Sequence, residues 1–270
     1  MFDRVTPRTK EHRMDREHFD HLAQEYDHYR TLDEATINYL VVTIPGHDQT
    51  ICDLGCGTGR YLVALIKAFQ AAGVRVNIAH GVDISPGMLK TARLRKDKLN
   101  PPVEWILGTS ERTGLPAQSI SLVTAFNSFH HLPIADTLAE VGRILVPGGF
   151  FAIYSRCRDQ EAEHIWECWF PGYLDYSQTL TREVLSGLSQ YNARFRLILA
   201  EDFTFTRKAP LSWICKQTEN KHYSTLNRYP RKEFEIAYSV FIKNIKAHCQ
   251  HLDEITYPSS YSLFLYQRMA

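Results

Sequence analysis

The feature that most constrains the fold is a glycine-rich segment between an apolar run and an amphipathic run. Residues 53–59 read Asp-Leu-Gly-Cys-Gly-Thr-Gly, and they end the β-rich run 50–54 and precede the helical pattern 60–72. Glycines at such a junction let a ligand approach the backbone at the carboxyl end of a strand, where open α/β sheets bind ligands. The segment therefore predicts a parallel α/β sheet with a ligand site after its first strand.

Short apolar runs and amphipathic runs then alternate as far as about residue 155. Such alternation is typical of consecutive βαβ units, which form a parallel sheet. The predicted strands are 50–54, 77–82, 103–107, 122–126 and 150–154. The predicted helices between them are 60–72, 86–99 and 136–145.

Both ends of the chain carry patterns of their own. Aromatic and apolar residues recur at helical spacing within 15–30, which predicts a helix with one apolar stripe. The runs 195–206 and 260–269 are expected to pair as an antiparallel edge, and the amphipathic run 231–250 indicates a mostly helical insertion between them. The expected domains are an N-terminal helical segment at 1–45, an α/β domain at 46–207, a helical insertion at 208–258 and a final strand at 259–270.

Aromatic residues gather in the part of the chain after the fifth predicted strand. They either line a pocket for a substrate or form ordinary hydrophobic core, which is the commoner fate of aromatic residues at helical spacing. The residues concerned are Trp166, Trp169, Tyr173, Trp213 and Tyr223.

Composition argues against several classes of protein. Thirty-one Lys and Arg against 30 Asp and Glu leave a net charge of +1, so a nucleic-acid substrate is disfavoured. Residues 1–20 hold no apolar signal-peptide core, and no run approaches the roughly 20 apolar residues of a membrane span. The six cysteines form no Cys-x-x-Cys pair, and His130 and His131 are adjacent, so we expect reduced thiols and no metal site. We expect a cytoplasmic protein.

The glycine segment does not match the fingerprint of nicotinamide and flavin dinucleotide enzymes. In the G-x-G-x-x-G pattern the third glycine would stand at Arg60. A carboxylate at Asp53 would repel a pyrophosphate at the helix N-terminus, but it suits a ligand with a sulfonium and an ammonium. Asp83 ends the second predicted strand, where such folds place an acid that accepts ribose hydroxyls, and the alternative is a cap for the helix near Pro86. These residues favour a cationic ligand with a free ribose.

Several motifs together make the chain resemble the class I S-adenosylmethionine-dependent methyltransferases. They are 53–59, Asp83, 108–111 with 115–116, 122–132 and 142–149, in this order. The resemblance is to the small-molecule branch similar to the ubiquinone and menaquinone biosynthesis enzymes (methyltransferase type 11-like), and it covers about residues 51–154. It implies a doubly wound, Rossmann-like, mostly parallel seven-stranded sheet with an antiparallel C-terminal edge, an N-terminal lid helix and a helical insertion before the last strand.

The resemblance also implies roles for single residues. Those implied to bind the cofactor S-adenosylmethionine are Arg30, Asp53, Gly55, Cys56, Gly57, Gly59, Asp83, Ile84, Met88, Thr109, Ser110 and Phe126. Thr109 stands where the family commonly has an aspartate that accepts from the adenine amino group, so that hydrogen bond is expected to be weaker or rearranged. Arg30 is implied to hold the methionine carboxylate, and the alternative is a solvated side chain.

If the acceptor is a hydroxyl or an activated carbon acid, His131 is the first candidate for a general base, because it resembles the base of phosphobase methyltransferases. Tyr26 or Tyr29 is a candidate partner for it. The alternative is that the histidine rings cap the next helix or satisfy backbone groups. Methyl transfer from a sulfonium is an in-line displacement that neutralises charge, so alignment can supply much of the acceleration and a base is not obligatory.

The leading hypothesis is therefore methyl transfer from S-adenosylmethionine to an O, N or C atom of a small molecule, by a monomer or weak dimer. A protein or RNA methyltransferase is the second hypothesis, although residues 126–129 read Phe-Asn-Ser-Phe and not Asn-Pro-Pro-Tyr. A degenerate member that serves as a partner subunit is the third, and the intact glycines and acids weigh against it.

Overall fold

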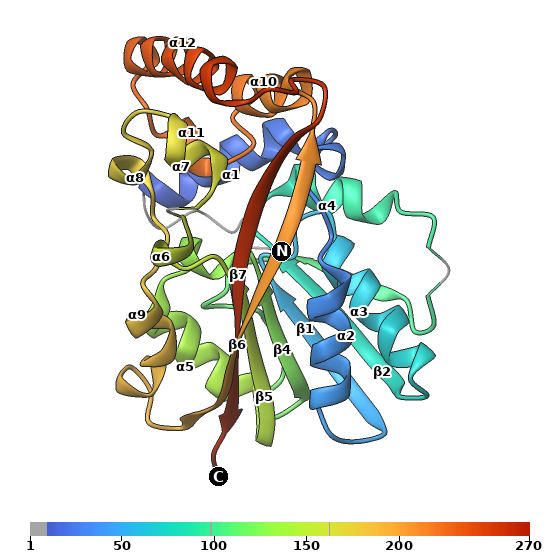
Figure 1. The fold of residues 1–270 in the computed structure, drawn as a ribbon. Coiled ribbons are helices and arrows are strands. Elements are labelled where there is room, and N and C mark those ends of the chain that lie inside the picture. Colours follow the sequence, from blue (N-terminus) through green and yellow to red (C-terminus); the bar gives the residue numbers. More distant parts are fainter. Residues whose placement is uncertain (1–9, 98, 162) are drawn as a thin grey trace. The chain divides into compact units, whose positions relative to one another are not determined.

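The computed structural model describes residues 10–97, 99–161 and 163–270 (Figure 1). Its strands are β1 (Asp48–Leu54), β2 (Arg75–Asp83), β3 (Val103–Leu107), β4 (Ile120–Phe126), β5 (Leu145–Ser155), β6 (Phe195–Ala209) and β7 (Ile255–Arg268). Its α-helices are α1 (Lys10–Leu22), α2 (Glu34–Thr43), α3 (Arg60–Ala71), α4 (Pro86–Arg93), α5 (Ile134–Ile144), α6 (Arg158–Glu161), α7 (Ile165–Trp169), α8 (Tyr173–Tyr176), α9 (Arg182–Ser186), α10 (Leu211–Glu219), α11 (Ser224–Asn227) and α12 (Arg231–His248). Its 3-10 turns are η1 (Tyr26–His28), η2 (Phe129–His131) and η3 (Leu188–Gln190).

The strands form one seven-stranded sheet in the order β3-β2-β1-β4-β5-β7-β6. The pairs from β3 to β5 are parallel, and β6 and β7 run side by side in opposite directions (Figure 1). This confirms the predicted Rossmann-like, mostly parallel sheet with an antiparallel C-terminal edge. The strand order reverses between β1 and β4, and open sheets of this kind bind ligands at the carboxyl ends of the strands beside such a reversal.

The chain divides into two compact units. The first unit comprises the chain up to Ser155 with 183–201 and 263–270, and the second comprises 156–182 and 202–262. The chain enters the second unit first after β5, returns to the first unit at 183, and then enters the second unit again along β6 and leaves it along β7. This division groups 156–182 with α10, α11 and α12, whereas the boundaries expected from the sequence group it with the sheet. Those boundaries stay a prediction.

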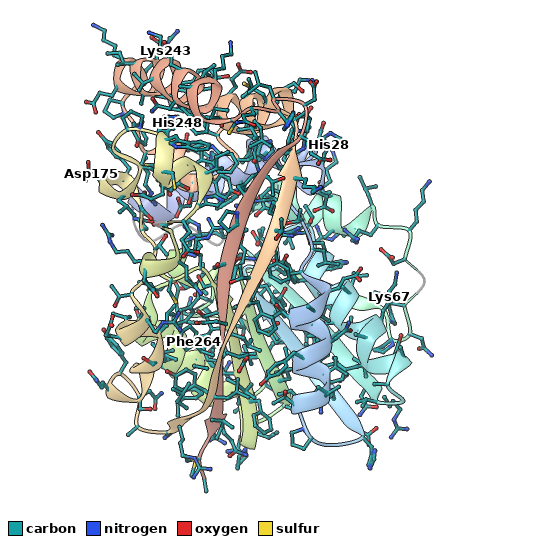
Figure 2. All side chains as sticks on the ribbon, viewed as in Figure 1. His28, Lys67, Asp175, Lys243, His248 and Phe264 are labelled. Atoms are coloured by element: carbon teal, nitrogen blue, oxygen red, sulfur yellow. The ribbon has the colours of Figure 1, made fainter. Side chains whose placement is uncertain are left out.

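The central strands of the first unit are buried almost throughout. Leu54 on β1, Leu122 on β4 and Phe264 on β7 are fully buried, whereas Lys67 on α3 faces solvent (Figure 2). Continuous burial is expected for parallel strands with helices on both faces. It explains why these strands read as apolar runs without polar alternation.

Two predicted helices end early. The helix expected over 15–30 ends at Leu22, and a 3-10 turn follows in which Asp27 bonds to Thr58 and Arg95. The helix expected over 86–99 ends at Arg93, and the next residues place Arg95 between Asp27 and Asp97. In both cases side-chain bonds to distant residues stabilise the non-helical backbone. Residues 1–9 of the predicted lid and residue 98 of the second predicted helix lie outside the described residues.

The aromatic residues of the second unit form its hydrophobic core. Trp166 and Tyr173 are buried, Trp169, Trp213 and Tyr223 pack against the same cluster, and this favours the interpretation as core. The predicted helix 231–250 is present as α12. No α-helix within the described ranges combines the length and the apolar content needed to cross a membrane.

Candidate functional site

A pocket opens in the first unit at the carboxyl ends of β1, β2 and β4. It holds about 970 Å³ of space when its open mouth is included. The residues predicted for the cofactor that line it are Asp53, Gly55, Cys56, Gly57, Asp83, Ile84, Met88, Thr109, Ser110 and Phe126. Both predicted catalytic residues, Tyr26 and His131, line it as well, whereas Gly59 and Arg30 are outside the lining.

The glycines of the loop after β1 serve two different purposes. Gly57 and Gly59 both have positive φ, at 55° and 75°. A Cβ atom at Gly59 would lie 2.2 Å from Cη2 of Trp105, so only glycine leaves room for the indole ring at this position. A Cβ atom at Gly57 would meet nothing within 4 Å. Gly59 is therefore required by internal packing, and the space beside Gly57 belongs to the pocket.

Asp83 receives a backbone hydrogen bond on each carboxylate oxygen. The amide of Gly57 donates to Oδ2 and the amide of Ser85 donates to Oδ1, both at 2.8 Å. Burial raises the pKa of Asp83, the two amides oppose this, and the nearby charge of Asp20 adds to the rise. Ser85 caps α4, since its Oγ accepts from the amide of Met88 at 3.0 Å. Asp83 therefore ties the glycine loop to β2, and its remaining lone pairs can accept from a ligand.

Asp53 is a buried carboxylate whose main side-chain partner is neutral. It is 1% exposed, and Oγ1 of Thr124 donates to its Oδ1 at 2.7 Å. Burial, with the charge of Asp83, raises the pKa of Asp53 to about 7. No ion pair within the described part of the chain involves Asp53. A cation bound beside it would favour the ionised form.

An aromatic stack forms one wall of the pocket. Phe126 stacks on Tyr61 with ring centroids 4.6 Å apart and an interplanar angle of 8°. The hydroxyls of Tyr61 and Tyr154 donate to the same oxygen of Asp33, at 3.0 and 2.9 Å. Sequence reasoning missed Tyr61, although its position directly after the glycine loop and Arg60 was a usable signal.

The N-terminal segment packs against the start of α4. Oδ1 of Asp20 accepts from Oγ of Ser85 and from the amide of Gly87, at 2.5 and 2.8 Å.

The Arg30 guanidinium lies 5.5 Å from the ring centroid of Tyr26. Its predicted bond to the methionine carboxylate stays a prediction.

His131 has a carboxylate partner that the sequence analysis did not name. Its Nδ1 lies 3.1 Å from Oδ2 of Asp15, and the two side chains are 12% and 15% exposed. Of the two predicted partners, Tyr26 lies edge-on to Phe19 with ring centroids 6.4 Å apart, and Tyr29 lies edge-on to His28 with ring centroids 4.9 Å apart. The usable signal was the spacing of Asp15 and Phe19, which puts both on one face of α1.

The charges that line the pocket are mostly negative. Asp15, Asp53, Asp83 and Glu111 contribute carboxyl groups and Arg60 the opposite charge. No group of three or more His, Cys, Asp or Glu is placed to hold a metal ion in the part of the chain that the structure describes. The lining suits a ligand that carries positive charge.

Comparison with known proteins identifies this part of the chain. A family model described as a methyltransferase domain matches residues 51–149. Residues 51–149 are therefore similar to a methyltransferase domain. The matched residues include the glycine loop, Asp83, Thr109 and His131.

The matched part of the chain is also similar to several curated proteins. A malonyl-[acyl-carrier protein] O-methyltransferase of Marinomonas is 28% identical over 154 residues, which are 56% of this chain and 54% of the relative. Aklanonic acid methyltransferase of Streptomyces is 31% identical over 42% of this chain and 51% of the relative. The bifunctional biotin biosynthesis protein of Teredinibacter turnerae is 33% identical over 50% of this chain and 25% of the relative. The chain thus spans about a quarter to a half of these relatives.

Solved structures share the fold of most of the chain. A protein of Anaeromyxobacter dehalogenans described as a type II methyltransferase superposes with a TM-score of 0.63 at 18% identity, covering 88% of this chain and 96% of that one. A geranyl diphosphate methyltransferase in complex with S-adenosylmethionine superposes with a TM-score of 0.53 at 17% identity, covering 88% and 86%. At these identities the likeness is one of fold.

Proposed function

We propose that the chain binds S-adenosylmethionine in the pocket of the first unit and transfers its methyl group to an O, N or C atom of a small molecule. The observation that carries the proposal is the joint placement of the glycine loop, Asp83 and Asp53 around one acidic pocket. When bound, the cofactor supplies an electrophilic methyl group on a sulfonium.

The residues present fit that cofactor. Asp83 retains acceptor capacity for a ribose diol beside the amide of Gly57. Asp53 provides a buried negative charge for a cationic ligand. Phe126 and Tyr61 present stacked rings to the same space, where an aromatic surface attracts a cation and excludes water. These groups hold and orient the reactants, which is the main requirement of an in-line displacement.

The names of the relatives support a small-molecule acceptor. Aklanonic acid and geranyl diphosphate are small molecules in the names of two of these proteins, and the balanced charge of this chain gives no reason to prefer a nucleic acid. We extend the proposal to a cytoplasmic monomer or weak dimer in which residues 1–45 act as the lid and residues 208–258 as the cover of the acceptor.

Isothermal titration with S-adenosylmethionine and, separately, with NADH tests the cofactor. We expect micromolar affinity for the first and none for the second. Asp83→Ala removes the ribose acceptor and should weaken binding by about 1–3 kcal/mol, which is about 5- to 150-fold. Asp48→Ala is the matched control, since Asp48 is an exposed aspartate at the other end of β1 that pairs with Arg75.

A folded wild-type chain that fails to bind S-adenosylmethionine would overturn the proposal and favour a degenerate partner subunit. Circular dichroism and thermal unfolding establish that each variant is folded. Equal affinity of Asp83→Ala and wild type would reject the ribose role of Asp83 alone.

A further inference from the structure

One face of α1 holds the ring of His131 from two sides. Asp15 and Phe19 are four residues apart, so they project from the same face of the helix. The carboxylate of Asp15 lies 3.1 Å from Nδ1. The ring of Phe19 lies edge-on to the imidazole, with centroids 5.4 Å apart and an interplanar angle of 86°. All three side chains line the pocket.

The pairing with Asp15 decides which ring nitrogen of His131 carries the proton. An ionised carboxylate only accepts hydrogen bonds, so Nδ1 must donate and the neutral imidazole carries its proton there. Nε2 then has a lone pair. Among the described side chains none makes a hydrogen bond to Nε2. The amide of His131 donates to the carbonyl of Ser128 at 2.9 Å, which fixes the backbone from which the ring extends.

We propose that Asp15 is a positioning residue that holds His131 as the Nδ1–H tautomer, so that Nε2 takes a proton from the methyl acceptor. The acceptor is accordingly a protic nucleophile, either a hydroxyl of the phenol or enol type or an activated carbon acid. This inference rests on the proposed function and names the substrate class for the same pocket.

The O–H or C–H bond of the acceptor breaks and its proton moves to Nε2. The electron pair left on the acceptor forms the new bond to the methyl carbon, and the pair of the broken carbon–sulfur bond stays on sulfur as a neutral thioether. His131 becomes an imidazolium beside the carboxylate of Asp15, which stabilises that charge, and then returns the proton to water.

A general base does not accelerate attack by an acceptor that is already ionised, because that acceptor has no proton to give up. A carboxylate has lost its proton near neutral pH and attacks without help. A phenol with a pKa near 10 is protonated at that pH and gains from a base at hydrogen-bond distance. The dyad therefore favours protic acceptors over carboxylates.

The tautomer is measured by nitrogen-15 NMR of histidine-labelled protein, using full-length wild type, Asp15→Asn and Asp20→Asn. We expect His131 of wild type to carry its proton on Nδ1. Asp15→Asn replaces an obligate acceptor by a group that also donates, so the Nε2–H form should gain population. Asp20→Asn should leave the tautomer unchanged, because Asp20 lies on the same helix but bonds to Ser85 and Gly87.

A proton on Nε2 in wild type, or the same tautomer ratio in Asp15→Asn and wild type, would overturn the positioning role. A change of equal size in Asp20→Asn would show that the effect comes from loosening the helix, and would overturn it too. Neither readout needs the cofactor, so failure of cofactor binding remains distinguishable from failure of this inference.

The acceptor class is tested with defined probes in the presence of S-adenosylmethionine, by measuring the thioether product. The protic probes are p-cresol, catechol and acetylacetone, and the carboxylate probes are benzoate and malonate monoester. We expect methylation of at least one protic probe, reduced about tenfold or more by Asp15→Asn. Methylation of carboxylates alone, or of no protic probe by a protein that binds the cofactor, would reject the proposed class.

Discussion

Arg156 in the second unit and Asp53 in the first are buried ionisable residues that differ in how many hydrogen bonds the protein gives them. In the second unit the buried guanidinium of Arg156 bonds to the hydroxyls of Ser259 and Tyr261, both at 3.0 Å. In the first unit the buried carboxylate of Asp53 has a neutral hydroxyl as its partner and a pKa raised to about 7 by burial. Arg156 therefore has several hydrogen-bond acceptors around its guanidinium, whereas burial destabilises the ionised form of Asp53 in the free protein, and a bound cation would stabilise that form.

The largest expected effect is the loss of stability caused by Trp166→Ala in the second unit. Trp166 is fully buried, and its indole N–H donates to Thr218 at 2.8 Å. We expect the free energy of unfolding in urea to fall by about 3–5 kcal/mol. Trp213→Ala is the control, since Trp213 is only partly buried against the same cluster and should lose clearly less. Equal losses would show that the cluster is not the main support of the unit.

Asp53→Asn should have effects of opposite sign on stability and on binding. Between about pH 4 and 7 folded Asp53 holds a proton that the unfolded chain has lost, so its contribution to stability falls as pH rises through this window. Asparagine does not titrate, and the variant should therefore gain about 2 kcal/mol of stability relative to wild type between pH 5 and pH 8. Urea unfolding at both pH values measures the gain.

The same substitution should weaken the binding of S-adenosylmethionine, and the loss should be larger at pH 8 than at pH 6. Calorimetry at the two pH values checks this. If the difference in stability between Asp53→Asn and wild type did not change with pH, the pKa of Asp53 would not be raised in the folded protein.

Gly57→Ala and Gly59→Ala separate binding from stability inside the first unit. Both residues have positive φ, so alanine should cost about 1–2 kcal/mol of stability at either position. Gly59→Ala also forces its Cβ against Trp105, and we expect its stability loss to be the larger. At Gly57 the new methyl group enters open pocket space, so we expect this variant to lose more affinity for S-adenosylmethionine. Thermal unfolding and calorimetry of both variants decide this, and the reverse order would contradict it.

The smallest expected effects come from the two tyrosine hydroxyls that share Asp33. Tyr61→Phe and Tyr154→Phe each remove one hydrogen bond to the same oxygen and leave the other in place, so each should cost about 1 kcal/mol of stability. Tyr61 lines the pocket and Tyr154 does not. Only Tyr61→Phe should therefore change the affinity for S-adenosylmethionine, and a matched change in Tyr154→Phe would show that Asp33 acts on the pocket through both rings.

Much of the first unit could be predicted from the sequence, because its signals are local. The strand predicted over 103–107 has the observed bounds, and the helix predicted over 60–72 differs from α3 by one residue. Gly57 and Asp83 were named from a short motif and the end of a strand, and they lie 2.8 Å apart at the hydrogen bond. The start of β7 was less predictable, since it lies five residues before the expected 260. Pro258 and two serines make that stretch read as a loop.

The sequence by itself determined the alternation of strands and helices and the glycine loop after β1, since burial periodicity and backbone freedom are properties of neighbouring residues. The tertiary structure alone decided the pairs that give the pocket its chemistry. Asp15 meets His131 across 116 positions, and Thr124 meets Asp53 across 71. Such contacts depend on which strand ends and helix faces the fold brings together, and no local pattern of residues records that geometry.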